Sequence, residues 1–429
     1  LLSAHQAAGE LTGITLTGQA ESLVVLDSTG APLMNAISWM DERSKEECAE
    51  LEAKFSAAEC YARTGQPAAL PTWPATKILW LKKHRPDVFQ KAAHYVLLKD
   101  YIVCALTGKL LADCSIATFT YYFDIYQKQY WPEMLDFLGI SERQLPPLAE
   151  PCSGAGALLP EVAARLCVSE SISVNIGTLD HFAGMIGTGN VRPGMLSLST
   201  GTVLGLSTMA GDPVKRDTGI PMHYGFLPGT YVMLPTAESG GASLEWFRKA
   251  FLPETSYRQI DEQAALRRPG DLLFLPYIVG TNAPEFDLDA CGMFYGLRSK
   301  HDAFDLALAV MEGVAHLLKK NCDMILASGT PIERIIATGG GAKSALWCQL
   351  QADITGIPVS IPAEKEAACL GAAMIGATSA GVYKDFSEAA NAAVRLEATF
   401  APQTDERNER KHRQFVALYE AMICVQRMK

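Results

Sequence analysis

Residues 173–206, SVNIGTLDHFAGMIGTGNVRPGMLSLSTGTVLGL, decide the fold class of this chain, because strand and helix signals alternate within them. The run Ser173–Gly177 predicts a strand, and a helical pattern begins at His181. The turn Arg192–Gly194 then leads into two strands that flank Ser199–Thr202. Alternation of this kind is typical of α/β layers, in which helices cover a sheet.

The same alternation extends to both ends of the sequence. Residues 12–26 predict two short strands around a polar elbow at Gly18–Ser22, and Leu33–Trp39 predicts a third strand. The predicted helices and later strands are Arg43–Phe55, Thr76–His84, Lys99–Leu106, the amphipathic helix Ala303–Lys319, strand Arg334–Ala337, a helix from Lys343, strand Ile357–Ile361 and the small-residue helix Cys369–Ala380.

Two blocks that each begin with strands and end with helices predict two similarly built α/β halves with a cleft between them. Prolines and glycines concentrate at 146–160, which favours a boundary just after this stretch. We therefore expect one domain over 1–170 and a second over 171–429.

Composition excludes several function classes. A length of 429 residues favours two or three domains. Because 48% of the residues are hydrophobic and 20% are charged, the composition excludes global disorder. A net charge of −10 without any Lys/Arg run argues against a nucleic-acid or anionic-membrane surface, and no apolar run is long enough to span a bilayer. The expectation is a cytoplasmic protein without a nucleic-acid or membrane partner.

Cysteine and histidine usage gives no sign of a metal or a disulfide framework. The 11 cysteines are scattered singly, without Cys-x-x-Cys, and the 8 histidines form no His-Glu-x-x-His. Reduced thiols are therefore expected, and a transition-metal enzyme is disfavoured.

The chain opens Leu1-Leu2-Ser3 without Met, in what reads as the tail of a helix that ends at Gly9. This opening predicts that the sequence begins inside a longer protein.

Two turns have the composition of a phosphate site. Gly339–Gly341 lies between a β-branched strand and a helix, where glycines let backbone approach a ligand and free N–H groups can bind an anion. Ser199–Thr202 presents hydroxyls and N–H groups between two strands, as anion-binding nests do. An ordinary βα turn and an ordinary hairpin turn are the alternatives.

Asp180 and two polar segments near the N-terminus are the other candidates. Asp180, at a strand end where a helix begins, is either an N-terminal helix residue or a general base that accepts a proton from a sugar hydroxyl. Gln19 and Glu21 in the elbow, with Trp39, Asp41 and Arg43, combine polar groups with an aromatic wall, as sites for hydroxyl-rich ligands do. A surface ion pair between Asp41 and Arg43 is the alternative.

Taken together, these segments resemble the FGGY family of carbohydrate kinases, which includes glycerol kinases and xylulokinases. The resemblance runs nearly end to end and is strongest in Gly177–Thr202, Gly280–Leu297 (with Ala283-Pro284) and Thr338–Gly371. Lys99-Asp100-Tyr101 and Thr76–Trp80 match the family's N-terminal domain, which places that domain at 1–170 and the nucleotide-binding domain at 171–429.

The resemblance implies two actin-like, ribonuclease H-like domains that close over a sugar and ATP-magnesium. It places Asp180 on the catalytic base. Substrate-binding positions are implied for Gln19, Glu21, Trp39, Asp41 and His181, and nucleotide-binding positions for Thr200, Gly201, Thr202, Gly241, Gly340 and Gly341. The chemistry implied is transfer of the γ-phosphoryl group to a sugar hydroxyl, with magnesium ligands unknown.

Departures from the family pattern leave alternatives open. The family's opening hairpin with an Asp-x-Gly-Thr/Ser phosphate loop has no counterpart before Thr12, which predicts either truncation or loss of catalysis. Ala20 stands where glycerol kinases carry Arg, and Ala20-Glu21 stands where xylulokinases usually carry Met-His. The prediction is a ketopentose kinase, for example of xylulose, with a glycerol or polyol kinase, a non-catalytic sugar- or nucleotide-binding protein and an actin-like assembly ATPase as alternatives. A homodimer is kept as one possible assembly.

Overall fold

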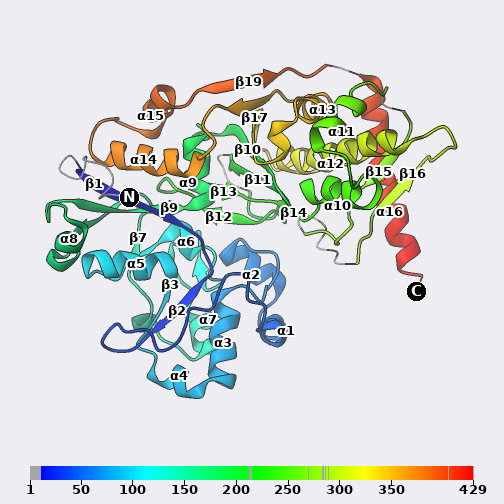
Figure 1. The fold of residues 1–429 in the computed structure, drawn as a ribbon. Helices are drawn as coiled ribbons and strands as arrows, with labels where there is room; N and C mark the ends of the chain where they lie inside the picture. The colour runs from blue at the N-terminus through cyan, green and yellow to red at the C-terminus, as the bar shows by residue number, and fades with distance from the viewer. Residues whose placement is uncertain are drawn as a thin grey trace. The chain divides into compact units, whose positions relative to one another are not determined.

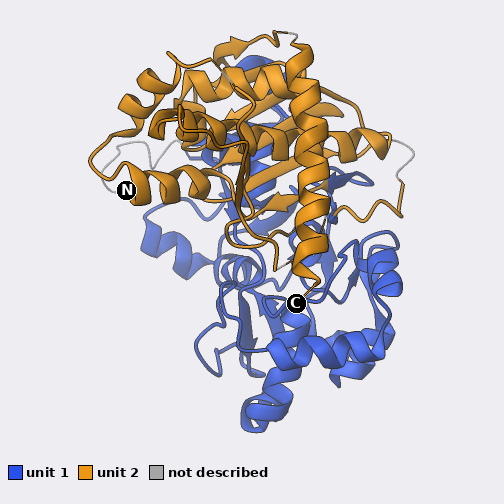
Figure 2. Ribbon diagram, turned by 90° about the vertical axis from the view of Figure 1, so that its right-hand side faces the viewer, with its two compact units in different colours: residues 1–191, 221–232, 366–394 blue, residues 192–220, 233–365, 395–429 orange. Residues whose placement is uncertain are grey.

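The computed structural model describes residues 11–428 except 212–214, 269, 283–284, 286, 288 and 404. The predicted helix tail before Gly9 and the Ala283-Pro284 motif lie outside the described residues. The chain forms two compact units (Figure 2), and each is described by itself. Unit 1 comprises residues 1–191, 221–232 and 366–394, and unit 2 comprises 192–220, 233–365 and 395–429. Each unit thus takes three stretches of chain, whereas the sequence predicts two consecutive domains; that division at residue 170 stays a prediction.

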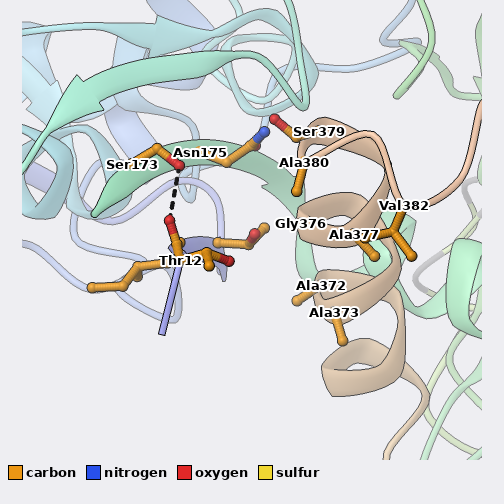
Figure 3. Close-up of a pocket in the computed structure, with 13 residues that line it drawn as sticks. Thr12, Ser173, Asn175, Ala372, Ala373, Gly376, Ala377, Ser379, Ala380 and Val382 are labelled. Carbon is orange, nitrogen blue, oxygen red and sulfur yellow. Dashed lines mark hydrogen bonds between the residues drawn. The ribbon is translucent and has the colours of Figure 1, made fainter. Parts of the chain in front are cut away.

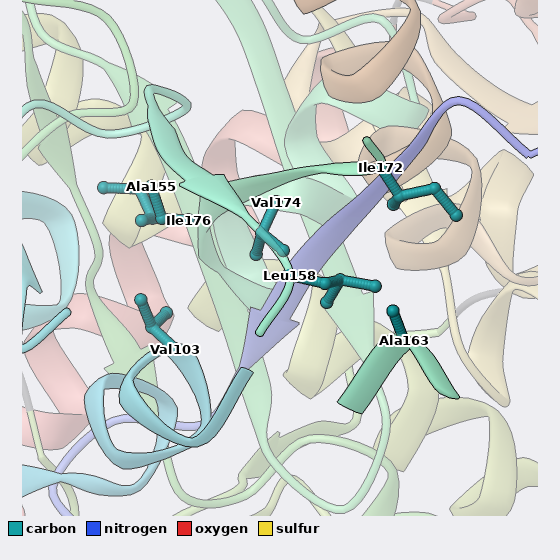
Figure 4. Packing of buried hydrophobic residues seen from close by; sticks show 7 residues of the cluster. All are labelled: Val103, Ala155, Leu158, Ala163, Ile172, Val174 and Ile176. Carbon is teal, nitrogen blue, oxygen red and sulfur yellow. The ribbon is translucent and has the colours of Figure 1, made fainter. Parts of the chain in front are cut away.

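The central sheet of unit 1 joins distant parts of the sequence. Strand β1 (Gly13–Gly18) runs parallel to β9 (Ser173–Leu179), which pairs antiparallel with β8 (Gly154–Ala157). Strand β9 is buried along almost its whole length, as expected for a strand covered on both faces. Figure 4 shows Val174 and Ile176 of β9 packed with Val103 of helix α5 (Leu98–Thr107) in one hydrophobic cluster.

A second part of unit 1 contains β2 (Leu23–Leu26) and β3 (His94–Leu97), which pair antiparallel although four helices lie between them in the sequence. The elbow between β1 and β2 is where the sequence predicts it. The other helices of unit 1 before α9 are α1 (Lys45–Lys54), α2 (Ala57–Thr64), α3 (Pro74–His84), α4 (Pro86–Lys91), α6 (Cys114–Ala117), α7 (Pro132–Leu138) and α8 (Pro160–Leu166). Helix α8 packs in the hydrophobic cluster of the central sheet. The short strands are β4 (Ala112–Asp113), β5 (Phe123–Asp124), β6 (Gln129–Tyr130), β7 (Leu148–Ala149) and β12 (Met222–Tyr224), with β13 (Tyr231–Met233) at the unit's boundary.

The predicted strand Leu33–Trp39 is wrong. Within it only one isolated bridge forms, Ile37 with Leu23, and a second joins Pro32, just before it, to Leu26. Pro32 has no amide hydrogen, and the chain bends after it, so a continuous ladder along β2 cannot form.

Two helices of unit 1 pack at backbone distance. Helix α9 (Asp180–Gly187) lies against α14 (Ala367–Ser379) (Figure 1). A Cβ atom built on Gly187 would lie 1.8 Å from the Ala367 carbonyl oxygen, and one on Gly371 would lie 1.8 Å from that of Ala183. The small-residue helix predicted at Cys369–Ala380 is therefore confirmed, together with its close packing. Helix α15 (Phe386–Ala393) follows it.

Unit 2 contains a larger sheet in the order β11-β10-β17-β18-β19. Strand β10 (Gly194–Thr200) is antiparallel to β11 (Leu204–Met209) and parallel to β17 (Ile332–Thr338). Strand β18 (Val359–Pro362) continues the parallel part, and β19 (Leu396–Phe400) is antiparallel to it. The other strands are β14 (Thr236–Ala237), β15 (Leu273–Leu275) and β16 (Met293–Tyr295).

The helices of unit 2 include the longest one predicted from the sequence. Helix α12 (Ala303–Ala327) starts where expected, capped by Asp302, whose carboxylate accepts from the Phe304 and Asp305 amides, and it continues past Lys319 because Cys322 and Ile325 remain buried. The others are α10 (Gly241–Phe251), α11 (Tyr257–Ala264), α13 (Ala345–Thr355) and α16 (Glu406–Gln426). Among the residues described in both units, no helix has the length and apolar character needed to cross a bilayer.

Candidate functional site

A cavity of about 560 Å³ in unit 2 collects every residue predicted to bind nucleotide. These residues are Thr200, Gly201, Thr202, Gly241, Gly340 and Gly341. The rest of its lining is Leu244, Glu245, Tyr257, Arg258, Asp261, Lys343, Ser344 and Trp347. Four separate segments of chain, 200–202, 241–245, 257–261 and 340–347, therefore meet here.

Sheet register brings the two predicted turns together. Ser199 of β10 is the partner of Thr338 of β17, and the strands are parallel, so the turns that follow them leave the sheet at the same edge. Gly339 has φ of 81°, a left-handed conformation that glycine adopts without strain. Residues of both turns line the cavity, and backbone N–H groups and threonine hydroxyls of such turns are groups that bind anions.

Glycine is required in this cavity for space as well. A Cβ atom on Gly341 would lie 2.7 Å from the Thr200 side chain, and one on Gly241 would lie 2.4 Å from the Gly201 carbonyl oxygen. The Gly241 amide donates to that same carbonyl at 2.7 Å, which ties the start of α10 to the β10–β11 turn.

The sequence analysis did not predict the cavity wall that Leu244, Asp261 and Trp347 form. Ser344 caps α13 by accepting from the Trp347 amide, and its hydroxyl also hydrogen-bonds the carboxyl of Asp261 on α11. Burial raises the pKa of Asp261, and this hydrogen bond offsets part of the rise. Leu244 and Trp347 are buried, so this wall combines apolar surface with one carboxyl. No local motif marks Asp261, because α11 reaches the cavity only through tertiary packing.

Asp180 is the first residue of α9 in unit 1, as the sequence predicts. Its carboxylate accepts from the His181 amide at 2.7 Å and remains partly exposed. Burial and hydrogen bonding do not distinguish a base from a helix-end carboxylate, so its catalytic role stays a prediction. His181 beside it is exposed.

A buried polar network holds the strand end that carries Asp180. The hydroxyls of Ser115 and Thr178 lie 2.7 Å apart, and Ser115 also donates from its amide to the Asp113 carboxylate at 2.7 Å. Lys99 forms an ion pair with Asp113 at 2.6 Å and donates to the Ile176 carbonyl of β9. Side chains from α5, β4 and α6 thus contact the C-terminal end of β9.

The elbow contains a residue in unusual backbone geometry. Glu21 has φ of 66°, which a residue with a side chain rarely adopts, and such strain is often found at functional sites. Burial raises the pKa of its carboxyl to about 7, although Lys77 and a hydrogen bond with Thr72 act in the opposite direction. Glu21 therefore titrates near neutral pH.

The structure brings the predicted sugar-contact segments together. The Trp39 amide donates to the Ser22 hydroxyl at 3.0 Å, and Lys77 donates to the carbonyl oxygens of both Glu21 and Ser38. The elbow of residues 18–22, which includes Gln19, thus adjoins the turn of residues 38–41. Trp39 is 46% exposed, which leaves much of its ring available.

Asp41 forms the ion pair with Arg43 that the sequence analysis gave as the alternative to a substrate contact. Its carboxylate forms a two-point contact with Arg43, at 2.8 Å to Nε and 2.6 Å to Nη2, and this hydrogen bonding lowers its pKa. The Arg43 guanidinium in turn lies 4.8 Å from the Trp80 ring centroid. The ion pair exists, and a substrate contact by Asp41 stays a prediction.

A second cavity, of about 430 Å³, lies in unit 1 between β1, β9 and α14 (Figure 3). Its polar side chains are Thr12, Thr15, Ser173, Asn175 and Ser379, and alanines of α14 supply much of the remainder. No residue that lines it carries a charge, and none is a predicted site residue. It offers no group for proton transfer.

Comparison with known proteins finds two family domains, one after the other along the chain. Residues 2–187 match the FGGY family of carbohydrate kinases, N-terminal domain, and residues 194–380 match the C-terminal domain. The xylulose kinase of Bacillus subtilis is 31% identical over 96% of this chain and 83% of its own length. The autoinducer-2 kinase of an Enterobacter strain is 30% identical over 94% of this chain and 79% of its own.

The fold comparison points the same way. The crystal structure of xylulose kinase from Rhodospirillum rubrum has a TM-score of 0.92 and 28% identity, over 98% of this chain and 86% of that one. The chain therefore belongs to the FGGY family of carbohydrate kinases: it is an ATP-using phosphotransferase that acts on an alcohol group, built from two actin-like α/β domains.

Proposed function

We propose that this kinase phosphorylates a ketopentose, with xylulose as the first candidate. The observation that carries the proposal is the elbow of residues 18–22 joined to the Trp39–Asp41 turn, in a chain about 30% identical to several xylulose kinases. An exposed indole beside a carboxyl and an amide suits a polyhydroxylated chain, because the ring packs on C–H faces while the polar groups bind hydroxyls.

In this proposal Asp180 is the general base. Its carboxylate accepts the proton of the attacking sugar hydroxyl, the hydroxyl oxygen forms a bond to the γ-phosphorus of ATP, and the bond to the β,γ-bridging oxygen breaks to release ADP. The Ser115–Thr178 contact orients the strand end from which Asp180 projects.

The cavity of unit 2 is proposed to hold ATP. Backbone amides of the two glycine-bearing turns, with Thr200 and Thr202, bind the phosphates, and the wall of Leu244, Trp347 and Asp261 receives the base. Magnesium, when bound to the phosphates, offsets charge on the transferred group. Among the described residues no group of three or more His, Cys, Asp or Glu side chains is placed to hold a metal ion, which suits a magnesium ion bound mainly by ATP phosphates and water.

A polyol kinase is the second candidate, because the family that the chain belongs to and resembles in sequence includes glycerol kinases. Ala20 opposes it: the side chain is buried and offers no guanidinium to a small polyol. A cytoplasmic location and a homodimeric assembly stay predictions.

The test is ADP release by the full-length protein with xylulose, ribulose, other ketopentoses, glycerol and longer polyols. Turnover on a ketopentose with Asp180→Asn inactive supports the proposal. Turnover on glycerol alone moves the assignment to the polyol class. Nucleotide binding without turnover on any substrate overturns the catalytic assignment and supports a binding protein.

A further inference from the structure

Lys77 of α3 is a lysine with no exposed surface. Its ammonium group donates to the Glu21 carbonyl oxygen at 3.0 Å and to the Ser38 carbonyl oxygen at 2.8 Å. Lysine is rarely buried to this extent unless its charge is compensated. Burial of the Lys77 ammonium therefore costs desolvation free energy, which the two hydrogen bonds to loop carbonyls must help to offset.

The two carbonyls belong to the two segments proposed to contact sugar. Glu21 lies at the strained point of the elbow, and Ser38 comes directly before Trp39. No regular strand joins these segments, because residues 33–39 form only one isolated bridge with β2. Beside the Lys77 contacts, the Trp39 amide donates to the Ser22 hydroxyl, and next to these segments Leu23 and Ile37 exchange two backbone hydrogen bonds of 2.9 Å.

The charges around Lys77 explain how it is tolerated. Burial lowers the pKa of Lys77 to about 8, while the carboxylates of Glu21 and Asp41 favour its charged form and Arg43 disfavours it. Glu21 in turn is faced by Lys77 and by the Thr72 hydroxyl. The ammonium and the Glu21 carboxyl therefore form a coupled pair inside the site.

We propose that Lys77 is a positioning residue of the sugar site: by bonding the Glu21 and Ser38 carbonyls, it holds the elbow and the Trp39–Asp41 turn in one arrangement that binds the sugar. This inference rests on the proposed function, in that it takes both segments to be sugar contacts. Lys77 itself, with no exposed surface, does not touch the substrate.

The Lys77–Glu21 pair makes KM for the sugar depend on pH. The ionised Glu21 carboxylate is the better acceptor for sugar hydroxyls, so KM for the sugar rises as pH falls through about 7. Lys77 lowers the pKa of Glu21, so loss of its charge raises that pKa and moves the rise in KM to higher pH.

The experiment compares Lys77→Met with wild type in full-length protein, measuring kcat, KM for sugar, KM for ATP and the pH profile of sugar KM. The sugar is whichever acceptor the wild type turns over in the screen above, so a failure of xylulose does not affect this comparison. We expect sugar KM to rise roughly tenfold or more, because small displacements of binding groups have large effects. KM for ATP is expected to stay unchanged and the pH midpoint to move upward.

Two further variants make the test specific. Lys82→Met removes a lysine of the same helix that is exposed and donates to the Phe137 carbonyl at 3.3 Å, so it serves as the matched control and should match wild type. Lys77→Arg keeps the charge and should restore most of the sugar affinity and the original pH midpoint, and it keeps the test decisive if Lys77→Met does not fold. A purely structural role predicts lower kcat and lower Tm with sugar KM and its pH midpoint unchanged, and that result, or an unperturbed Lys77→Met, overturns the proposal.

Discussion

The hydroxyl of Ser115 lies 2.7 Å from the hydroxyl of Thr178, two residues before Asp180. The contact links α6 to the end of β9, across 63 positions of sequence. Ser115 is itself bound to Asp113, which pairs with Lys99. A base must be held in place to work, so this buried chain of contacts is part of what the proposed mechanism needs.

Ser115→Ala should lower kcat while leaving KM for ATP unchanged. It removes the Thr178 contact and leaves the Asp113 carboxylate with one donor fewer in a buried setting, which we expect to cost about 1–3 kcal/mol of unfolding free energy. Denaturant unfolding and steady-state kinetics measure both effects. Ser169→Ala, at an exposed serine pair, is the control and should change neither.

Asp180→Asn should lower kcat by about 10²–10⁴-fold, because the amide cannot accept the proton of the sugar hydroxyl. Sugar and ATP affinities, measured by calorimetry, should stay near wild type. Asp87→Asn, which changes an exposed aspartate paired with Arg85, controls for loss of a negative charge. Turnover of Asp180→Asn at the wild-type rate would remove Asp180 from the base role.

Gly341→Val should weaken ATP binding by at least about tenfold, since its Cβ atom would meet the Thr200 side chain at 2.7 Å within the cavity. Nucleotide titration followed by tryptophan fluorescence or calorimetry gives the affinity. Gly205→Ala on β11 has open space around its Cβ and should bind ATP as wild type does. Equal affinities for all three proteins would contradict the nucleotide assignment of this cavity.

Glu21→Gln should flatten the pH dependence of stability between pH 4.5 and 7. Burial raises the pKa of Glu21 from 4.5 to about 7, so the folded state holds a proton that the unfolded state has released across this range. The contribution of Glu21 to the free energy of unfolding is therefore largest below pH 4.5 and is lost as the pH rises through about 7. Tm of Glu21→Gln relative to wild type should therefore rise from pH 5 to pH 8, and a constant difference would contradict the assigned pKa.

Local patterns determined much of this protein. Periodicity predicted α12, the β10–β11 pair and the glycine turn after β17, because hydrophobic spacing and glycine positions act over a few residues. The six residues predicted to bind nucleotide line one cavity, and nucleotide binding by them stays a prediction. The strand at Leu33–Trp39 failed because alternation cannot show that Pro32 and a bend interrupt the ladder.

Only the tertiary structure decided which distant groups meet. Lys77 reads as one lysine of a helical pattern, yet packing buries it beneath two loops 39 and 56 residues away. Asp261 reaches the cavity wall, and Ser115 the end of β9, through contacts of the same kind. Burial and charge compensation depend on the complete three-dimensional packing, so no window of sequence contains them.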